Sequence, residues 1–352
     1  MLALSPPDVL DLVVGLSPDR SVFVWGPPGV GKSALVREAA ARLSMPCVTL
    51  LGTQIAPEDL IGVPRIRRLP SGRDATEFCP PSAVLLDVPF LLFVDELNSA
   101  VPDVQKTFYS LILDRRLGDH QLPAGSRVVG AGNRAEDRAL VRPMPTALAN
   151  RMIHVALQPT AEAWLDWAAV ADVHPLVMAF VRTRPQRLSE SPPSDSTPAY
   201  PTPRAWHMLS DALSAVPERL WHAVAVGSVG ERAGTEFHAF ARRAREVPTV
   251  EEMATGTRPV PDEPDLQYFA ATAVLAHLAR SETIAGQHAA EAIRRIGQKS
   301  QEIAAWALDS AFARPLPTDA FRAFDTTIRT TAGSVLVEVL KLQRYRKEQK
   351  TT

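Results

Sequence analysis

The chain has 352 residues, too many for one hydrophobic core, and this length predicts two or three domains. It carries 38 Lys and Arg against 39 Asp and Glu, and a formal net charge of -1 provides no overall field that would attract nucleic acid or an anionic membrane. Its two cysteines, Cys47 and Cys79, make no pairs at metal-ligand spacing and no apolar run approaches the roughly 20 residues of a spanning helix, so we expect no zinc site, no disulfide framework, no membrane segment and a cytoplasmic location.

The first predicted elements lead into a glycine-rich loop. Residues 7–14 have the pattern of a short helix with Ser5 as its cap, and residues 22–25 predict a buried strand. Directly behind that strand the sequence fits the pattern G-x-x-x-x-G-K-[ST], and a predicted helix begins at Ala34. The members of the loop are Gly26, Pro27, Pro28, Gly29, Val30, Gly31, Lys32 and Ser33.

This loop, a P-loop, is typical of a nucleotide-binding site. Glycines let backbone N–H groups turn toward phosphate oxygens, and the N-terminus of the helix behind them favours negative charge. We expect Lys32 to reach the terminal phosphates and the Ser33 hydroxyl to bind Mg²⁺. A chance glycine-rich turn is the alternative, and the strand before the loop and the helix after it argue against that alternative.

Residues 52–87, behind the second predicted strand, form a connection that is too long for a simple loop. We interpret this connection as an insertion. Within it, residues 57–62 predict a short helical turn, and residues 65–69 and 75–78 predict the two arms of a hairpin. A mobile surface loop is the alternative.

Four more strands complete a predicted parallel sheet of five. Helices predicted at residues 101–114 and 145–149 alternate with these strands, and residues 115–125 predict a second, smaller hairpin. Helices on both faces of a parallel sheet make a three-layer α/β domain, which we expect to span residues 1–158 and to bind its ligand at the carboxyl edge of the strands. The four strands are residues 47–51, 90–94, 127–131 and 152–157, and the first two of them are expected to be buried on both faces.

Beyond residue 158 only helical patterns remain. Residues 159–246 predict an all-helical domain, the Pro-rich residues 247–264 look like a linker or a boundary, and residues 265–352 predict a helical C-terminal region. The predicted helices are residues 161–171, 174–183 and 203–216, one or two within 218–245, and residues 267–280, 285–308 and 327–347.

Two carboxylates, Asp95 and Glu96, come directly after the strand at residues 90–94. Asp95 would lie beside the P-loop at the carboxyl edge of the sheet and hold Mg²⁺, since a hard cation prefers oxygen ligands. Glu96 would orient and deprotonate the attacking water. A surface turn is the alternative for such a pair, and the P-loop upstream argues against it.

Three more polar residues are candidates for the same site. Asn133 follows the fourth strand, so its amide would lie near the γ-phosphate and the lytic water, although Gly132-Asn133 alone is also typical of a turn. Arg151 and Arg204 could bind phosphate oxygens because a guanidinium group donates in a fixed fork. A solvated surface position is the alternative for either arginine.

The five motifs together resemble those of a known family. In chain order they are VFVWGPPGVGKS, FLLFVDELN, VVGAGNR, TALANRM and PTPRAW. This order is similar to the Walker A, Walker B, sensor 1, arginine-finger and sensor 2 series of AAA+ ATPases. Within that class the chain most resembles MoxR-like proteins, which have an Asn at the position of Asn98, a hairpin before sensor 1 and an insertion after the second strand. The resemblance covers about residues 1–245.

The resemblance implies ATP and Mg²⁺ as cofactors and a helical lid behind an αβα AAA+ domain. It also implies a ring, usually of six subunits, in which an arginine finger completes the neighbour's site, and a partner protein with a von Willebrand factor A domain. Arg134, Arg138 and Arg142 are alternative finger residues, and Arg204 could act on its own nucleotide or on the neighbour's. The implied roles are Walker A for Lys32 and Ser33, Walker B for Asp95 and Glu96, sensor 1 for Asn133, the finger for Arg151 and sensor 2 for Arg204.

Two other functions remain open from the sequence. A nucleic-acid motor similar to McrB-type NTPases would share the insertion, in which Arg65, Arg67, Arg68 and Arg73 form a basic cluster. The near-neutral net charge and the absence of an aromatic–basic stripe argue against that motor. The third hypothesis is a regulatory scaffold that binds ATP and hydrolyses it slowly.

Overall fold

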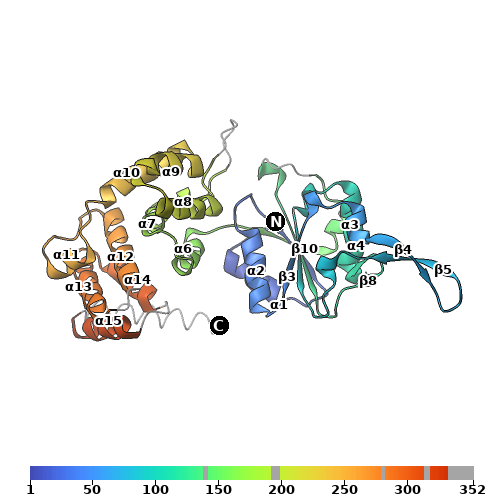
Figure 1. The fold of residues 1–352 in the computed structure, drawn as a ribbon. Helices are drawn as coiled ribbons and strands as arrows, with labels where there is room; N and C mark the ends of the chain where they lie inside the picture. Colours follow the sequence, from blue (N-terminus) through green and yellow to red (C-terminus); the bar gives the residue numbers. More distant parts are fainter. Residues whose placement is uncertain (138–141, 192–198, 279–281, 313–317, 332–352) are drawn as a thin grey trace. The chain divides into compact units, whose positions relative to one another are not determined.

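The computed structural model describes residues 1–137, 142–191, 199–278, 282–312 and 318–331 (Figure 1). These residues form two compact units. The first is built from residues 1–163 with short pieces at 191 and 202–204, and the second from residues 164–190 and from residue 205 onward. The division into domains at residues 158 and 246 stays a prediction.

A parallel sheet forms the centre of the first unit, as predicted, in the strand order β1-β10-β2-β9-β6-β3. It has six strands, so the prediction of five is wrong by one strand. The additional strand, β1, contains only Ala3–Leu4 and pairs with β10 at the sheet edge. Two residues are too few to produce an apolar pattern in the sequence. The other five are β2 (Ser21–Trp25), β3 (Cys47–Leu51), β6 (Leu91–Asp95), β9 (Arg127–Gly132) and β10 (Met152–Leu157).

Burial differs between the two strands that were expected to be covered on both faces. Strand β6 is buried along residues 91–94, whereas β3 is mostly half-buried. The expectation is therefore wrong for β3. The reason is topological: β3 is the last strand of the sheet and pairs only with β6, while β6 lies between β3 and β9.

Helices cover both faces of the sheet and give the three-layer arrangement. One face packs against α1 (Pro6–Gly15) and α2 (Lys32–Arg42), with a shared core that contains Val24 and Val36. The other face packs against α4 (Pro102–Asp114) and α5 (Thr146–Ala149), with Phe23 and Phe108 in its core. Helix α1 begins as predicted, because Ser5 and Asp8 form a capping box at its N-terminus.

The insertion contains the predicted hairpin. Strands β4 (Val63–Arg68) and β5 (Asp74–Cys79) pair in antiparallel fashion and extend away from the sheet (Figure 1). The predicted helical turn is α3 (Pro57–Ile61), and the single-turn helices η1 (Gly52–Gln54) and η2 (Ser82–Val84) flank the hairpin. The second predicted hairpin is present as β7 (Arg116–Leu117) and β8 (His120–Gln121). Two more single turns are η3 (Leu97–Ser99) and η4 (Ala135–Asp137).

The described part of the second unit is helical, as expected. The predicted helix at residues 285–308 is two helices, because Ser300 has an extended backbone (φ -144°, ψ 108°) that separates α13 from α14. The helix predicted at 327–347 begins earlier, at residue 318, and residues 332–347 lie outside the described residues. The elements are α6 (Ala161–Val170), which begins at the end of the first unit, α7 (Pro175–Thr183), η5 (Pro185–Arg187), α8 (Pro203–Ala215), η6 (Glu218–Leu220), α9 (Trp221–Val229), α10 (Glu231–Ala244), α11 (Val250–Thr255), α12 (Pro264–Leu278), α13 (Thr283–Lys299), α14 (Gln301–Phe312) and α15 (Thr318–Thr331).

Residues 247–264, which look like a linker in the sequence, are packed. They contain α11, and Val250, Met253 and Val260 are buried in one cluster with residues of α12, α13 and α14. Gly256 ends α11 and Pro264 begins α12, so the prolines do not separate this segment from the core. None of the helices in the described residues is both long and apolar enough to cross a membrane.

Candidate nucleotide site

The P-loop connects the carboxyl end of β2 to the first turn of α2. Its turn requires glycine at two positions, since Gly29 and Gly31 have φ of +76° and +103°, a region that side chains disfavour. A Cβ on Gly29 would also lie 2.8 Å from the Thr202 hydroxyl. Gly31 is the N-cap of α2, so the loop places the positive end of the helix dipole at its concave side.

Lys32 is buried at the start of α2, with 8% of its surface exposed. Its ammonium group donates hydrogen bonds to the carbonyl oxygens of Gly26 (2.6 Å) and Pro27 (3.1 Å) and to Oδ1 of Asn133 (2.8 Å). Burial lowers the pKa of Lys32 to about 8, although the negative charge of Asp95 acts in the opposite direction. The structure thus brings together Lys32 and Asn133, two predicted site residues from opposite ends of the first unit's sequence.

Ser33 and Asp95 form a second pair. The Ser33 hydroxyl donates a hydrogen bond to Oδ2 of Asp95 at 2.9 Å, and Oδ1 of Asp95 accepts one from the backbone N–H of Glu96 at 3.0 Å. A hydroxyl and a carboxylate at this separation provide the oxygen donors that Mg²⁺ prefers. The donor set therefore fits the metal that the sequence predicts at Ser33 and Asp95.

Glu96 has a left-handed backbone conformation, with φ 53° and ψ 32°. Such a conformation is uncommon for a residue other than glycine and is concentrated at functional sites. Its carboxylate accepts a hydrogen bond of 2.7 Å from the hydroxyl of Thr53, which lies in η1 immediately after β3. Sequence reasoning missed Thr53. Thr53 follows the carboxyl end of β3, the strand next to the one that carries Asp95, and this position could have identified it as a candidate site residue.

Asn98 is hydrogen-bonded to the backbone of Asn133. It is 2% exposed, and its side-chain amide donates a hydrogen bond of 2.8 Å to the backbone carbonyl of Asn133. Gly132 makes this approach possible, because a Cβ there would lie 1.9 Å from Oδ1 of Asn98. The sequence indicates Asn98 only through the family resemblance, and in the structure its side chain holds the backbone of Asn133 in place.

The two predicted arginines lie at different ends of the sheet: Arg204 contacts the P-loop, whereas Arg151 directly precedes β10, at the amino end of the strands. The backbone N–H of Arg204 donates to the carbonyl of Gly29 at 3.1 Å, and its charge is one of the causes that lower the pKa of Lys32. Arg151 is exposed, and its guanidinium carbon lies 5.1 Å from the centre of the Tyr109 ring in α4. Among the described residues, no hydrogen bond or ion pair joins Arg151 to Lys32 or Asn133.

The alternative finger residues have different surroundings. Arg134 forms ion pairs with Glu136 (2.8 Å) and Asp137 (3.1 Å) of its own chain, which occupies its guanidinium group. Arg142 is exposed, and Arg138 lies outside the described residues. Asp137 was also missed from the sequence. It is buried, and its negative charge raises the pKa of Lys32 against the effect of burial.

Comparison with known proteins agrees with this geometry. Residues 21–152 match the family model of the AAA domain, dynein-related subfamily. The chain is 30% identical over 157 residues to the proteasome-activating nucleotidase of Methanocella arvoryzae, covering 43% of this chain and 35% of that protein. It is 27% identical over 143 residues to the 26S proteasome regulatory subunit 6B homolog of Schizosaccharomyces pombe, covering 37% and 34%. The chain thus spans about a third of the length of the curated relatives it matches.

Among solved structures, the RuvB Holliday junction branch migration motor of Thermotoga maritima matches with a TM-score of 0.39 and 17% identity, covering 73% of this chain and 77% of that one. The chain has a parallel sheet, a P-loop at the end of β2, and hydrogen bonds that join Lys32 to Asn133 and Ser33 to Asp95. Together with the family match they identify residues 21–152 as an AAA domain of the AAA+ ATPase class.

Proposed function

We propose that this protein binds ATP with Mg²⁺ at the P-loop and hydrolyses it. The observation that carries the proposal is the joining of the Walker A residues to the strand ends, Lys32 to Asn133 and Ser33 to Asp95. Phosphate oxygens would replace the carbonyl oxygens of Gly26 and Pro27 as acceptors of the Lys32 hydrogen bonds. When bound at Ser33 and Asp95, Mg²⁺ would neutralise charge on the phosphates.

Glu96 is proposed as the residue that orients the attacking water and accepts its proton. The two carboxylates have different partners, since Asp95 accepts a hydrogen bond from Ser33 and Glu96 accepts one from Thr53, and this difference supports a metal-binding role for Asp95 and a proton-accepting role for Glu96. The amide of Asn133 is proposed to contact the γ-phosphate and the water, because it is held next to the Lys32 ammonium group.

The test is the Glu96→Gln variant. The amide keeps the shape of the side chain but cannot accept a proton, so we expect ATP binding to persist while turnover falls by about 10²- to 10⁴-fold. Binding is measured with a fluorescent ATP analogue and turnover by phosphate release. Glu136→Gln, at an exposed carboxylate paired with Arg134, is the matched control and should retain turnover. Normal turnover in the Glu96 variant would sink the assignment.

We further propose a ring, with six subunits as the expected number, in which Arg151 completes the site of the neighbouring subunit. The support is its exposed position and the Tyr109 ring beneath it, which leave its guanidinium group on the surface of its own subunit. An arginine supplied in this way is worth about 10³- to 10⁵-fold in rate in related phosphoryl-transfer enzymes. Activity per subunit should therefore rise with protein concentration and fall with Arg151→Ala.

Arg322→Ala is the matched control for the finger, because Arg322 is an exposed arginine of α15 and is not one of the candidate finger residues. It should leave the concentration dependence intact. Activity that is independent of protein concentration and unaffected by Arg151→Ala contradicts the shared site.

The work done with ATP is proposed to be that of a MoxR-like protein, the remodelling or activation of a partner with a von Willebrand factor A domain, in the cytoplasm. Support comes from the buried Asn98 and from the hairpin of β4 and β5, which presents Val63 (70% exposed) and Ile66 (81% exposed) to solvent. Exposed aliphatic side chains on a projecting hairpin suit contact with another protein.

A purified partner of this class should bind the Glu96→Gln variant in ATP and dissociate when ATP is removed. The double variant Val63→Ser/Ile66→Ser keeps the strand pairing while removing the apolar contact, so it should lose the partner. Equal binding with and without ATP, or equal binding by the hairpin variant, contradicts the proposal.

The nucleic-acid motor is less well supported. Arg65 and Arg67 share one ion-pair partner, Glu77, and Arg68 pairs with Asp74, so two carboxylates of the hairpin offset half of the positive charge of the four arginines. Salt-dependent DNA binding that disappears when these arginines are replaced would favour the motor. The slow regulatory scaffold is distinguished by an ATPase assay with and without the partner, since a scaffold would show no acceleration.

A further inference from the structure

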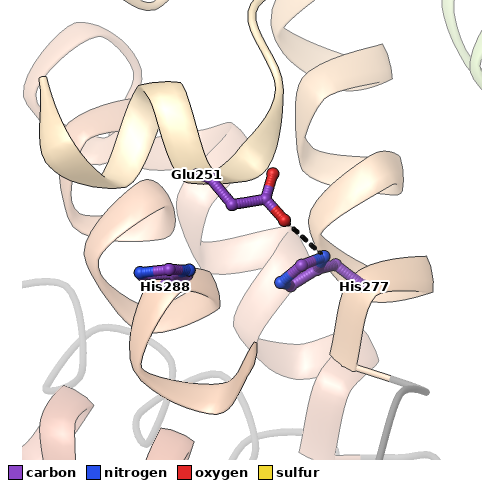
Figure 2. A group of neighbouring side chains, drawn as sticks. All are labelled: Glu251, His277 and His288. Carbon is purple, nitrogen blue, oxygen red and sulfur yellow. Dashed lines mark ion pairs between the residues drawn. The ribbon is translucent and has the colours of Figure 1, made fainter. Parts of the chain in front are cut away.

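Three potential metal ligands meet in the helical second unit, far from any motif of the sequence. Glu251 comes from α11, His277 from α12 and His288 from α13, and Figure 2 shows their side chains gathered between the three helices. One ligand atom of each residue lies within 4.8 Å of the others. Nδ1 of His277 and Oε1 of Glu251 are 3.6 Å apart.

The helices that carry these residues are fixed by a common core. Met253, Val274 and Ile293, one from each helix, are at most 1% exposed and belong to a single hydrophobic cluster. Helix α11 is further held at its ends, by a capping box between Thr249 and Glu252 and by Gly256 in a left-handed conformation. The three side chains therefore start from a rigid frame, which lowers the cost of arranging them around an ion.

We propose that Glu251, His277 and His288 form a binding site for a divalent transition-metal ion, with Zn²⁺ as the preferred ion. Two imidazoles and one carboxylate select Zn²⁺ over Mg²⁺ and Ca²⁺, which prefer oxygen ligands alone. Ligand atoms on one tetrahedral Zn²⁺ lie about 3.3 Å apart, given bonds of about 2.0–2.1 Å. The His277–Glu251 separation already approaches that value, and a ring nitrogen of His288 lies within 4.8 Å of both ligand atoms.

The surroundings suit such an ion. His277 is 8% exposed, whereas the Glu251 side chain is 46% exposed, so the site has one buried and one open side. The open side would admit water as a fourth ligand. Two neutral imidazoles and one carboxylate also leave the complex with a low net charge, which limits the cost of placing it beside an apolar core.

An ion pair between Glu251 and His277 is the simpler reading of the same contact. It requires His277 to be protonated and gives His288 no part. The metal site requires both imidazoles to be neutral and uses all three residues. Only the metal site predicts that a divalent ion stabilises the protein and that replacing His288 removes this stabilisation.

A bound ion would connect the short helix α11 to the two long helices α12 and α13. Helix α11 has only six residues, and bonds from the ion would add to its packing against the shared core. The expected consequence is greater thermal stability of the helical unit in the presence of Zn²⁺. The Mg²⁺ proposed for the P-loop is independent of this ion, because its donors are all oxygens.

The experiment uses the full chain after treatment with a chelator, in buffer with excess Mg²⁺. Zn²⁺ titration by calorimetry should show one ion per chain, and thermal unfolding should move to higher temperature. His288→Ala should lower Zn²⁺ affinity by at least about 100-fold, more than the loss usually seen for residues outside the ligand set. Co²⁺ in place of Zn²⁺ should give the visible absorption of a four-coordinate site, and His288→Ala should abolish it.

Circular dichroism shows whether His288→Ala disturbs folding. Glu251→Gln is a second variant that changes a different ligand, and it should also weaken Zn²⁺ binding. The matched control is His222→Ala, because His222 stacks on His238 with ring centres 4.9 Å apart and forms the other close histidine pair in the described part of this unit. The control should bind Zn²⁺ normally. No Zn²⁺ binding by the unaltered chain, or binding lost in His222→Ala and kept in both other variants, overturns the proposal.

Discussion

The P-loop region and the cluster of Glu251, His277 and His288 bring polar side chains together by different routes. In the P-loop region each residue follows a strand of one sheet or begins the helix after it, and the parallel strands deliver them to the same edge. In the helical unit the three residues lie on separate helices, and only the packing of those helices makes them neighbours. Local sequence motifs therefore predict the P-loop site but do not predict the cluster of Glu251, His277 and His288.

Charge is also treated differently in the two regions. Lys32 donates to neutral oxygens of Gly26, Pro27 and Asn133, and its burial lowers its pKa. Lys299, at the end of α13, is 42% exposed and forms an ion pair with Asp262. A buried ammonium group without a carboxylate on it is suited to an anionic ligand, whereas a paired surface lysine is not.

Replacing each of these lysines tests the contrast and should give the largest effect. Lys32→Ala removes a charge-assisted contact to phosphate, and we expect ATP affinity to fall by about 100-fold, equivalent to about 3 kcal/mol. Lys299→Ala should leave ATP affinity unchanged and cost at most about 1 kcal/mol of stability, as exposed ion pairs do. Equilibrium binding of a fluorescent ATP analogue measures both. Equal losses in the two variants would remove the distinction between the regions.

The same contrast explains what the sequence could predict. The P-loop, Asp95, Glu96 and Asn133 were found because a strand followed by glycine or by a carboxylate is visible in a short window of sequence. Parallel topology then placed their side chains at one edge, and the structure joins Lys32 to Asn133 and Ser33 to Asp95. The strands behind them were predicted for the same reason, since runs of apolar residues are unambiguous when bounded by turn residues.

Features that depend on tertiary packing were missed. The strand β1 has two residues and exists only because β10 offers an edge to pair with. The break at Ser300 comes three residues after Gly297, and the Ser300 hydroxyl accepts a hydrogen bond from the Ile303 N–H of α14, but a continuous apolar helical pattern runs across both residues and hides the break. The hydrogen bonds from Thr53 to Glu96 and from Asn98 to Asn133 follow from side-chain directions at strand ends, which a sequence does not give.

A second, smaller effect should follow from the pKa of Lys32, which is about 8 in the free protein. Phosphates bound beside the ammonium group would raise that pKa, so binding above pH 8 takes up a proton. ATP affinity should therefore fall by about tenfold between pH 8 and pH 9.5. Binding isotherms across this range measure the loss. Lys32→Arg stays charged throughout and should give a nearly flat profile.

The sign for folding is opposite. The pKa of Lys32 is lower in the folded protein than its ordinary value of 10.5, so between pH 8 and 10.5 the unfolded chain holds more protons. The contribution of Lys32 to the free energy of unfolding therefore rises with pH across this window, while ATP affinity falls. A parallel fall of stability and affinity, compared against Lys32→Arg, would show that Lys32 is not the titrating group.

The smallest expected effect concerns Thr53, whose hydroxyl donates to the Glu96 carboxylate. This hydrogen bond occupies one oxygen of the carboxylate and keeps that oxygen from the attacking water. Thr53→Val keeps the shape of the side chain and removes the donor, so the rate of ATP hydrolysis without a partner should rise by about two- to fivefold. This change is smaller than the free energy of a full charged hydrogen bond, because Glu96 retains contact with solvent. The KM for ATP should not change, since Thr53 contacts neither Lys32 nor Ser33 by a hydrogen bond in the described structure. Thr53→Ser restores the donor and should restore the original rate. A lower rate in Thr53→Val would contradict this prediction. It would mean that the left-handed backbone of Glu96 does not orient the carboxylate by itself, and that the hydrogen bond from Thr53 aligns the carboxylate for proton transfer.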